Sequence, residues 1–250
     1  MHVSNRTTQF AYFDQVLERP AWKGSKILDF GGNVGGFLKG AGSSIDHNDY
    51  WCMDVDQAAL EQARSEFPGA HFIHFDRYSS QYNPRGVRYL PIPVCEVKFD
   101  IILAFSVFTH THQAEVVDLV EQLGTMLVAG GALAFTFCDA RYDRSRSDLS
   151  LSPGSDVRKI LQWQRARNSA HDIDALVERA CSAKWCLVIG ENLYLEPGPE
   201  FSNQERVGEP WESYCSYFSA DYMAMLFPQG NVLSPVSPEW QHCCVLRKTE

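Results

Sequence analysis

The sequence predicts a single doubly wound α/β domain, in which helices pack on both faces of a parallel sheet. Strand-like apolar runs alternate with helix-like amphipathic runs between residues 26 and 138, and this alternation is typical of βαβ units. The chain has 250 residues, of which 45% are hydrophobic and 21% are charged. It is therefore long enough for one large domain with an extensive core.

Residues 1–25 are expected to form a cap ahead of the sheet. The run QFAYFDQVLER is expected to be helical because Phe10, Phe13 and Leu17 share a face at helical spacing. Pro20 and Gly24 then end this helix. The first strand is KILDF, the helix after it opens with GGFLKGAG, and the second strand is YWCMDV.

An amphipathic helix is expected over DQAALEQARSEF, with Asp56 available as its N-cap. Its face at helical spacing consists of Leu60, Ala63, Arg64 and Phe67. The third strand is AHFIHF and the fourth is FDIILAFSV. The apolar run of the fourth is nearly continuous, which fits a strand buried on both faces of a parallel sheet.

A clear helix is expected over QAEVVDLVEQLGTML, with one apolar face formed by Val116, Val120, Leu123 and Leu127. The fifth strand is GGALAFTFC. After Cys138 the alternation breaks, and DARYDRSRSDLSLSPGSD and EPGPEFSNQERVGEPWESY are expected to be loops. Between them IDALVERACSA predicts a helix and KWCLVIGENLYL predicts strand. A helix over SADYMAMLF then precedes two strands, NVLSPV and QHCCVLRK, which are expected to pair as an antiparallel hairpin.

Charge and cysteine usage limit the partners and the compartment. The formal net charge is −9, the basic residues form no stripe, and no apolar run reaches 18 residues. A nucleic-acid substrate is disfavoured and a membrane span is not expected. The N-terminus does not resemble a secretion signal. The eight cysteines form no CxxC pair, so we expect reduced thiols in a cytoplasmic protein rather than disulfides or a zinc site.

A glycine-rich turn follows the first strand and suggests a ligand site. It begins with Asp29 and continues Phe-Gly-Gly-Asn-Val-Gly-Gly, with Asn33 where a GxGxxG dinucleotide loop would need glycine. The Gly-Lys-Ser/Thr ending of a phosphate-binding P-loop is absent. The remaining pattern is an acidic strand end, a bare backbone and the start of a helix, which suits a ligand that carries an anion and polar groups. Asn33 is tolerated there because asparagine accepts positive φ.

Acidic residues also end the next two strands. Asp54 lies 22 positions after Gly32, and a carboxylate at this place can accept both hydroxyls of a ribose. Asp76 ends the third strand, where an adenine amino group could donate to it.

Together these segments resemble the class I S-adenosylmethionine-dependent methyltransferases of the small-molecule type. The resemblance covers ILDFGGNVGG, CMDVDQAALEQAR, FIHFDRYS, FDIILAFSVFTH and LVAGGALAFTFC, or roughly residues 26–138. The usual glycine motif of the family is DxGxGxG, and this sequence keeps Asp29, Gly31 and Gly35 but has Asn33 in the middle. The resemblance implies a Rossmann-like seven-stranded sheet with a C-terminal antiparallel hairpin and an insert before the last helix.

The resemblance divides the single domain, residues 1–250, into four parts. Residues 1–25 are the N-terminal cap, and residues 26–139 form the cofactor-binding core. Residues 140–217 form an insert or lid on the substrate side, and residues 218–250 supply the final helix and hairpin.

The cofactor implied by the resemblance is S-adenosyl-L-methionine. Asp29 and the glycine turn would hold its methionine moiety, Asp54 would bind the ribose hydroxyls, and the next residue would pack on the adenine. Asp76 would contact the adenine amino group, and Phe105 with Ser106 would line the reacting sulfur. The full set of implied cofactor-binding residues is Asp29, Gly31, Gly32, Asn33, Gly35, Asp54, Val55, Asp76, Arg77, Phe105 and Ser106.

Two histidines in SVFTHTHQ are the catalytic candidates. His110 resembles the histidine that many small-molecule members carry in this turn, and it could serve as a base or as a positioner of the acceptor. Capping the next helix or facing solvent is an equal alternative for His110 and the favoured one for His112. The pair could also suggest a metal site, but no third ligand has convincing spacing, so no metal is expected.

Aromatic residues of the insert and of the N-terminal cap are candidates for the acceptor side. A lid rich in aromatics could shield the reacting sulfur and cradle a flat or apolar acceptor. For any single aromatic residue, the favoured alternative is that it belongs to the core of the insert. The candidate substrate-binding residues are Tyr12, Phe13, Asp139, Arg206, Trp211, Tyr214 and Tyr217.

The sequence thus predicts an enzyme that methylates a small organic molecule, with oxygen as the first choice of acceptor atom and a natural-product pathway as the setting. Nitrogen or carbon is the close second choice. Two rival hypotheses are an NAD-type oxidoreductase, which would need a sixth parallel strand in place of the hairpin, and a catalytically silent subunit of the same fold. A homodimer is left open.

Overall fold

The computed structural model describes residues 7–141, 157–158, 172–189, 192–198, 214–236 and 241–249. None of the described helices is long and apolar enough to span a lipid bilayer.

The main sheet has seven strands in the order β3-β2-β1-β4-β5-β10-β9. Strands β1 to β5 pair in parallel, and β10 pairs antiparallel with both β5 and β9. This arrangement confirms the predicted sheet and its terminal hairpin. It contradicts the oxidoreductase hypothesis, which required a sixth parallel strand. The strands are β1 (Ile27–Phe30), β2 (Tyr50–Asp54), β3 (His71–His74), β4 (Phe99–Ala104), β5 (Leu127–Phe137), β9 (Asn231–Leu233) and β10 (His242–Arg247).

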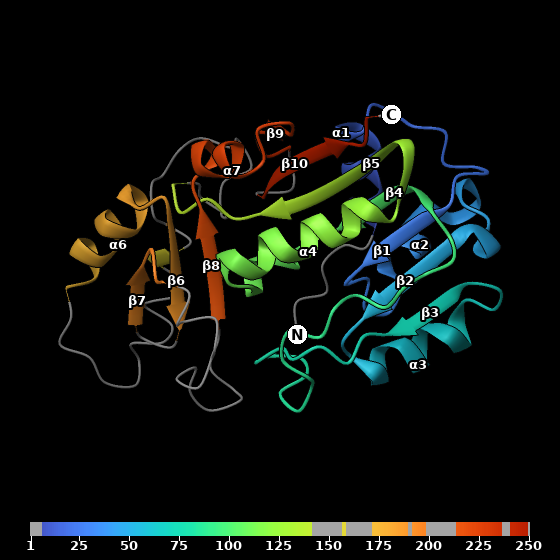
Figure 1. Ribbon diagram of the computed structural model, residues 1–250, viewed down its shortest axis with the longest axis horizontal. Coiled ribbons are helices and arrows are strands. Elements are labelled where there is room, and N and C mark those ends of the chain that lie inside the picture. The colour runs from blue at the N-terminus through green and yellow to red at the C-terminus, as the bar shows by residue number, and fades with distance from the viewer. Residues whose placement is uncertain are drawn as a thin grey trace.

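Helices cover both faces of this sheet, and in Figure 1 α4 crosses its front while α1 lies behind it. One face packs against α1 (Thr7–Val16), α2 (Gly36–Ala41) and α3 (Gln57–Glu66). The other packs against α4 (Gln113–Thr125) and α7 (Ala220–Leu226). Short 3₁₀ turns lie at η1 (Gly42–Ser44), η2 (His47–Asp49) and η3 (Phe108–His110).

The predicted helices form, and their ends differ in two places. Asp56 caps α3 as expected, because its side chain accepts a hydrogen bond from the backbone of Ala59. The predicted α4 face was wrong at Leu127, which starts β5 and pairs with Phe99. Helix α1 ends at Val16, before Pro20 is reached. Glu18 and Arg19 have positive φ angles of 60° and 55°, which an α-helix does not allow.

The described part of the insert forms a second, antiparallel sheet in the order β7-β6-β8. The strands of this sheet are β6 (Trp185–Ile189), β7 (Asn192–Leu195) and β8 (Tyr214–Phe218), and helix α6 (Ile173–Ser182) precedes them. The predicted helix and strand of the insert are confirmed, the strand as a β6–β7 hairpin. Strand β8 was not predicted, because its five residues, YCSYF, show no clear alternation of polar and apolar residues. In Figure 1 β8 lies beyond the carboxyl end of β5, and a β-bridge joins Cys138 to Tyr217.

Candidate functional site

The glycine turn after β1 needs unusual backbone conformations. Gly31, Asn33 and Gly35 have positive φ angles of 79°, 51° and 74°, as the sequence predicted for Asn33. A Cβ atom on Gly31 would lie 2.3 Å from Cγ2 of Val107. Gly31 therefore lets this turn pack against the turn after β4. The two turns meet where the strand order reverses, which is where open α/β sheets bind ligands.

Asp54 connects the end of β2 to the glycine turn. Its Oδ2 accepts a hydrogen bond from the backbone of Asn33 at 2.7 Å, and its Oδ1 accepts one from Asp56 at 2.8 Å. Burial raises the pKa of Asp54, and these backbone hydrogen bonds oppose the rise. Each carboxylate oxygen keeps a further lone pair, so the group can still accept ligand hydroxyls.

Asp29 lies beneath the same turn and is only 4% exposed. Its Oδ2 accepts a hydrogen bond of 2.5 Å from the phenol of Tyr50, a residue that the sequence analysis did not single out. Burial raises the pKa of Asp29 to about 7, although the Tyr50 hydrogen bond opposes the rise, and the charge of Asp54 adds to it. A Cβ atom on Gly32 would lie 2.5 Å from this carboxylate oxygen.

Asp76 and Arg77 follow β3, and their side chains differ in burial: Asp76 is exposed and Arg77 is buried. Asp76 is exposed, and its Oδ1 accepts a hydrogen bond from Asn83. The guanidinium of Arg77 is buried, donates to the carbonyl of Leu90 at 2.9 Å and forms an ion pair with Glu115 on α4 at 3.1 Å. The side chain of Arg77 is thus held by α4 and by the chain after β3, and its contact with the cofactor stays a prediction.

The turn after β4 is held by polar contacts from distant segments. Ser106 has a positive φ of 58°, and its backbone N–H donates to Thr136 Oγ1 at 2.7 Å. Gln241, just before β10, donates to Ser106 Oγ at 3.0 Å. Tyr12 on α1 donates to the Gln241 carbonyl at 3.2 Å. Its ring packs edge-to-face on Phe105 with centroids 6.0 Å apart.

The contact between Tyr12 and Phe105 brings the N-terminal cap to the predicted site. Phe13 also packs on Phe105 edge-to-face, but it is only 1% exposed and belongs to the core behind the sheet. Val55, after Asp54, is half-buried. Gln241 and Thr136 were missed because no local pattern marks their pairing with Ser106.

The two candidate histidines have different surroundings. His112 is only 1% exposed, and its Nδ1 accepts the backbone hydrogen bond of Ala114 as the N-cap of α4. The capping interpretation of His112 is confirmed, and a catalytic role for it stays a prediction. His110 is half-buried in η3, and its ring meets that of Tyr82 edge-to-face with centroids 5.6 Å apart.

Tyr82, in the segment between β3 and β4, was not predicted as a site residue. Its side chain is 47% exposed. Partial burial raises its pKa, and the charges of Cys215 on β8 and of Asp54 add to the rise. Ser216 on β8 donates to the carbonyl of Thr111. Three parts of the chain therefore meet around His110. They are the segment that follows β3, the turn η3 and the strand β8.

Asp139 and Tyr217 are the described members of the substrate-binding set near or within the insert, and both contact other parts of the protein. Asp139 is 3% exposed, pairs with Arg141 at 2.6 Å and accepts a hydrogen bond from Ala220. Burial alone would raise the pKa of Asp139, but these hydrogen bonds outweigh it and lower the pKa. Tyr217 is 2% exposed within the small core of the insert.

Asp139 and Tyr217 therefore have structural contacts, and their binding of substrate stays a prediction. Arg206 and Trp211 lie outside the described residues, as does the side chain of Tyr214. Within the described part of the chain no group of three or more His, Cys, Asp or Glu side chains could hold a metal ion.

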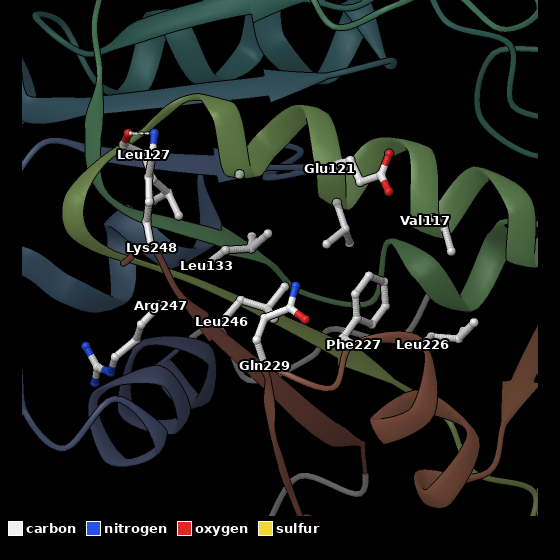
Figure 2. A pocket seen from close by; sticks show the side chains of 12 residues that line it. Val117, Glu121, Leu127, Leu133, Leu226, Phe227, Gln229, Leu246, Arg247 and Lys248 are labelled. Atoms are coloured by element: carbon white, nitrogen blue, oxygen red, sulfur yellow. Dashed lines mark hydrogen bonds between the residues drawn. The ribbon is translucent and has the colours of Figure 1, made fainter. Parts of the chain in front are cut away.

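A cavity of about 280 Å³ lies away from this site, between α4, α7 and the strands β5 and β10. Figure 2 shows its mainly apolar walls, including Leu133, Phe227 and Leu246, and the hydrogen bond from Lys248 to the carbonyl of Leu127. It reaches the first residue of β5, so it lies toward the amino end of that strand. None of the predicted site residues lines it.

Comparisons with known proteins agree with the geometry. The family model described as "Methyltransferase domain" matches residues 28–133. A solved S-adenosylmethionine-dependent methyltransferase from Clostridium acetobutylicum ATCC 824 is 10% identical, with a TM-score of 0.54 over 98% of this chain and 92% of that chain. The amino pentose methyltransferase CalS10 from Micromonospora echinaspora, solved with bound S-adenosylmethionine, is 13% identical, with a TM-score of 0.53 over 98% and 91%.

The glycopeptide N-methyltransferase MtfA is 8% identical, with a TM-score of 0.54 over 99% of this chain and 92% of that chain. Identities this low show a shared fold alone. The family match covers the segment that contains Asp29 and Asp54. Residues 28–133 therefore match a methyltransferase domain, and the chain shares its fold with solved S-adenosylmethionine-dependent methyltransferases.

Proposed function

We propose that this enzyme methylates a small organic acceptor in a biosynthetic pathway, with a hydroxyl oxygen as the first choice of acceptor atom. The observation that carries the proposal is the pairing of His110 with Tyr82 at the edge of the sheet where the cofactor-binding turns end. An imidazole can take the proton that a hydroxyl or amine acceptor must lose. The formal net charge of −9 favours a small molecule over a nucleic acid.

The residues at this edge suit the cofactor. Asp54 offers two carboxylate oxygens for ribose hydroxyls. Gly31 and Gly32 let the turn lie close to Val107 and Asp29, because a Cβ atom at either position would clash with these side chains. The exposed Asp76 carboxylate is available to an adenine amino group. When bound, the cofactor supplies a methyl group on a positively charged sulfur, which is already activated for displacement.

The protein's own contribution is then position and proton transfer. Ser106 and Phe105 shape the turn after β4 and would face the reacting end of the cofactor, fixed there by Thr136 and Gln241. His110 would accept the proton of the acceptor through a ring nitrogen. The ring of Tyr82 beside it would limit the access of water and orient the imidazole.

Nitrogen remains the second candidate for the acceptor atom. Two structural relatives are named as an amino pentose methyltransferase and a glycopeptide N-methyltransferase. The first is involved in calicheamicin biosynthesis. These names support the biosynthetic setting and keep an amine acceptor open, and the same His110 could deprotonate an ammonium.

We also propose a reducing compartment such as the cytoplasm. All eight cysteines are free thiols, and Cys52, Cys243 and Cys244 are buried in the sheet. Thiols persist in this state where glutathione and thioredoxin keep them reduced. Size-exclusion chromatography with light scattering would measure whether the chain forms the homodimer that the sequence analysis left open.

Cofactor binding is tested first, by calorimetry with S-adenosylhomocysteine and separately with NAD. We expect binding of S-adenosylhomocysteine alone, and Asp54→Ala should weaken it about 10- to 100-fold because hydrogen bonds to a carboxylate are lost. Asp118→Ala, which removes an exposed carboxylate on α4, is the matched control and should bind normally. Binding of NAD alone would contradict the assignment.

Catalysis is tested with methyl-labelled cofactor and a panel of phenols, sugar hydroxyls and amino sugars. His110→Ala should lower turnover of the accepted substrate at least 100-fold while leaving the affinity for S-adenosylhomocysteine within about twofold. Unchanged turnover in His110→Ala would show that His110 is not the general base. Labelling of amines but not hydroxyls would move the acceptor atom to nitrogen.

A further inference from the structure

The phenol of Tyr50 is a buried group that the mechanism above does not use. Tyr50 is the first residue of β2 and is fully buried, and its hydroxyl donates to Asp29 Oδ2 at 2.5 Å. The register pairs Tyr50 with Ile27 and Cys52 with Asp29. Tyr50 therefore lies two positions behind Asp29 on the same face of the sheet, and its phenol extends forward along the strands to reach the carboxylate.

Packing holds this phenol in place from the helix side. The ring of Phe37 on α2 lies parallel to that of Tyr50, with centroids 6.5 Å apart. A ring fixed between the sheet and α2 has little freedom to turn away, so the hydroxyl stays aimed at Asp29. Among the described residues, Tyr50 is the one side chain that donates a hydrogen bond to this carboxylate.

The carboxylate in turn lies directly under the backbone of the glycine turn. A Cβ atom on Gly32 would be 2.5 Å from Asp29 Oδ2 and 2.8 Å from the sulfur of Cys52. The thiol of Cys52 also faces the carbonyl of Asn33 at 3.8 Å. Tyr50, Asp29 and Cys52 thus form a support beneath the turn, with Tyr50 as its deepest member.

We infer that Tyr50 is a positioning residue for cofactor binding: its hydroxyl holds Asp29 as a carboxylate beneath the glycine turn, so that cofactor affinity depends on the ionisation of Asp29. The inference rests on the family assignment and is independent of the identity of the methyl acceptor. The methionine part of the cofactor carries an ammonium group. A buried carboxylate under the turn that holds this part favours such a cation, and a protonated carboxyl does not.

The sign of the pH dependence follows from the surroundings of Asp29. Among the described residues, the titratable groups that act on Asp29 are Tyr50, Cys52 and Asp54, which all lie on β2. Its partner on β4 is Leu103. Burial raises the pKa of Asp29 to about 7. Below this pH the carboxyl must lose a proton before it can pair with the ligand cation. Affinity should therefore rise with pH through neutrality and then level off, and binding should release a proton.

Removing the Tyr50 hydroxyl should change both the strength and the pH dependence of binding. The hydrogen bond from Tyr50 lowers the pKa of Asp29, so the pKa rises further without it. At pH 7 Tyr50→Phe should bind S-adenosylhomocysteine about tenfold more weakly, which corresponds to the loss of one hydrogen bond to a charged group. The rise in affinity should move upward by about one pH unit.

The experiment is isothermal calorimetry with S-adenosylhomocysteine between pH 5.5 and 8, in buffers of different ionisation enthalpy that reveal the released proton. Four proteins are compared: the unmodified chain, Tyr50→Phe, Asp29→Asn and the double variant. Tyr222→Phe, which removes a half-buried phenol on α7, is the matched control. We expect Asp29→Asn to show weak, pH-independent binding, and Tyr50→Phe to add nothing in that background.

Two calorimetric results would overturn the inference: an equal loss of affinity at every pH in Tyr50→Phe, or a pH dependence that survives in Asp29→Asn. A ligand-free measurement follows the ionisation of Asp29 directly, so the test does not depend on how well Tyr50→Phe folds. In protein labelled with ¹³C at aspartate carboxyls, the signal absent from Asp29→Asn should titrate near pH 7, and a midpoint below pH 5 would also overturn it. Methyl transfer enters none of these measurements, so failure of the proposed acceptor chemistry would be seen separately.

Discussion

Replacing Arg77 by methionine separates its structural role from the predicted cofactor contact. Methionine keeps the apolar stem but removes the hydrogen bond to Leu90 and the ion pair with Glu115, whose side chain is 13% exposed. The third contact, to Asp118 at 3.4 Å, contributes little because that carboxylate is 53% exposed.

The magnitude follows from these contacts. Breaking one partner of a buried ion pair costs about 3–5 kcal/mol. Glu115 keeps a long contact of 3.4 Å with the backbone N–H of His112, so we take the lower end, about 3 kcal/mol. In a chain of this size, each kcal/mol shifts Tm by roughly 2–4 °C, and the expected fall in Tm is about 6–12 °C.

The assay is thermal unfolding of Arg77→Met, followed by calorimetry with S-adenosylhomocysteine well below its Tm. Asp118→Asn is the control and should change Tm by about 1 °C or less. The double variant Arg77→Met/Glu115→Gln should recover part of the loss, because the unpaired buried charge is gone. A Tm within about 2 °C of the unmodified protein, or a tenfold loss of ligand affinity in the folded variant, would refute the structural assignment.

Two further predictions concern the glycine turn and β10. Gly31→Ala should lower stability by about 2–4 kcal/mol, because it adds strain at positive φ and a clash with Val107. Thermal unfolding should show partial rescue by Val107→Ala and no loss in Gly124→Ala, where a Cβ meets open space. Burial lowers the pKa of His242 to about 4 from 6.5. The unfolded chain therefore binds more protons between these values, and native stability should fall by about 3 kcal/mol as pH drops from 6.5 to 4. Urea unfolding should show a flatter pH dependence in His242→Gln, and an unchanged slope would contradict this origin.

Local patterns in the sequence were enough to predict the order of the elements of the main sheet and the carboxylates that end its strands. Strand periodicity, apolar runs and caps such as Asp56 act over a few residues, so they can be read without tertiary contacts. The parallel strands place their carboxyl ends at one edge, and this brings Asp29, Asp54 and Asp76 to the same edge of the sheet.

Side-chain direction and partner choice were decided only by the tertiary structure. Arg77 follows a strand end, as a ligand-binding residue would, yet its partner Glu115 lies 38 positions away on α4. Tyr82 meets His110, and Gln241 meets Ser106 across 135 positions. Such pairs depend on which distant segments pack together, and no periodicity within a segment encodes that. The sequence by itself therefore determined the fold and the acidic edge of the sheet, whereas packing decided which polar residues face the ligand and which hold the scaffold.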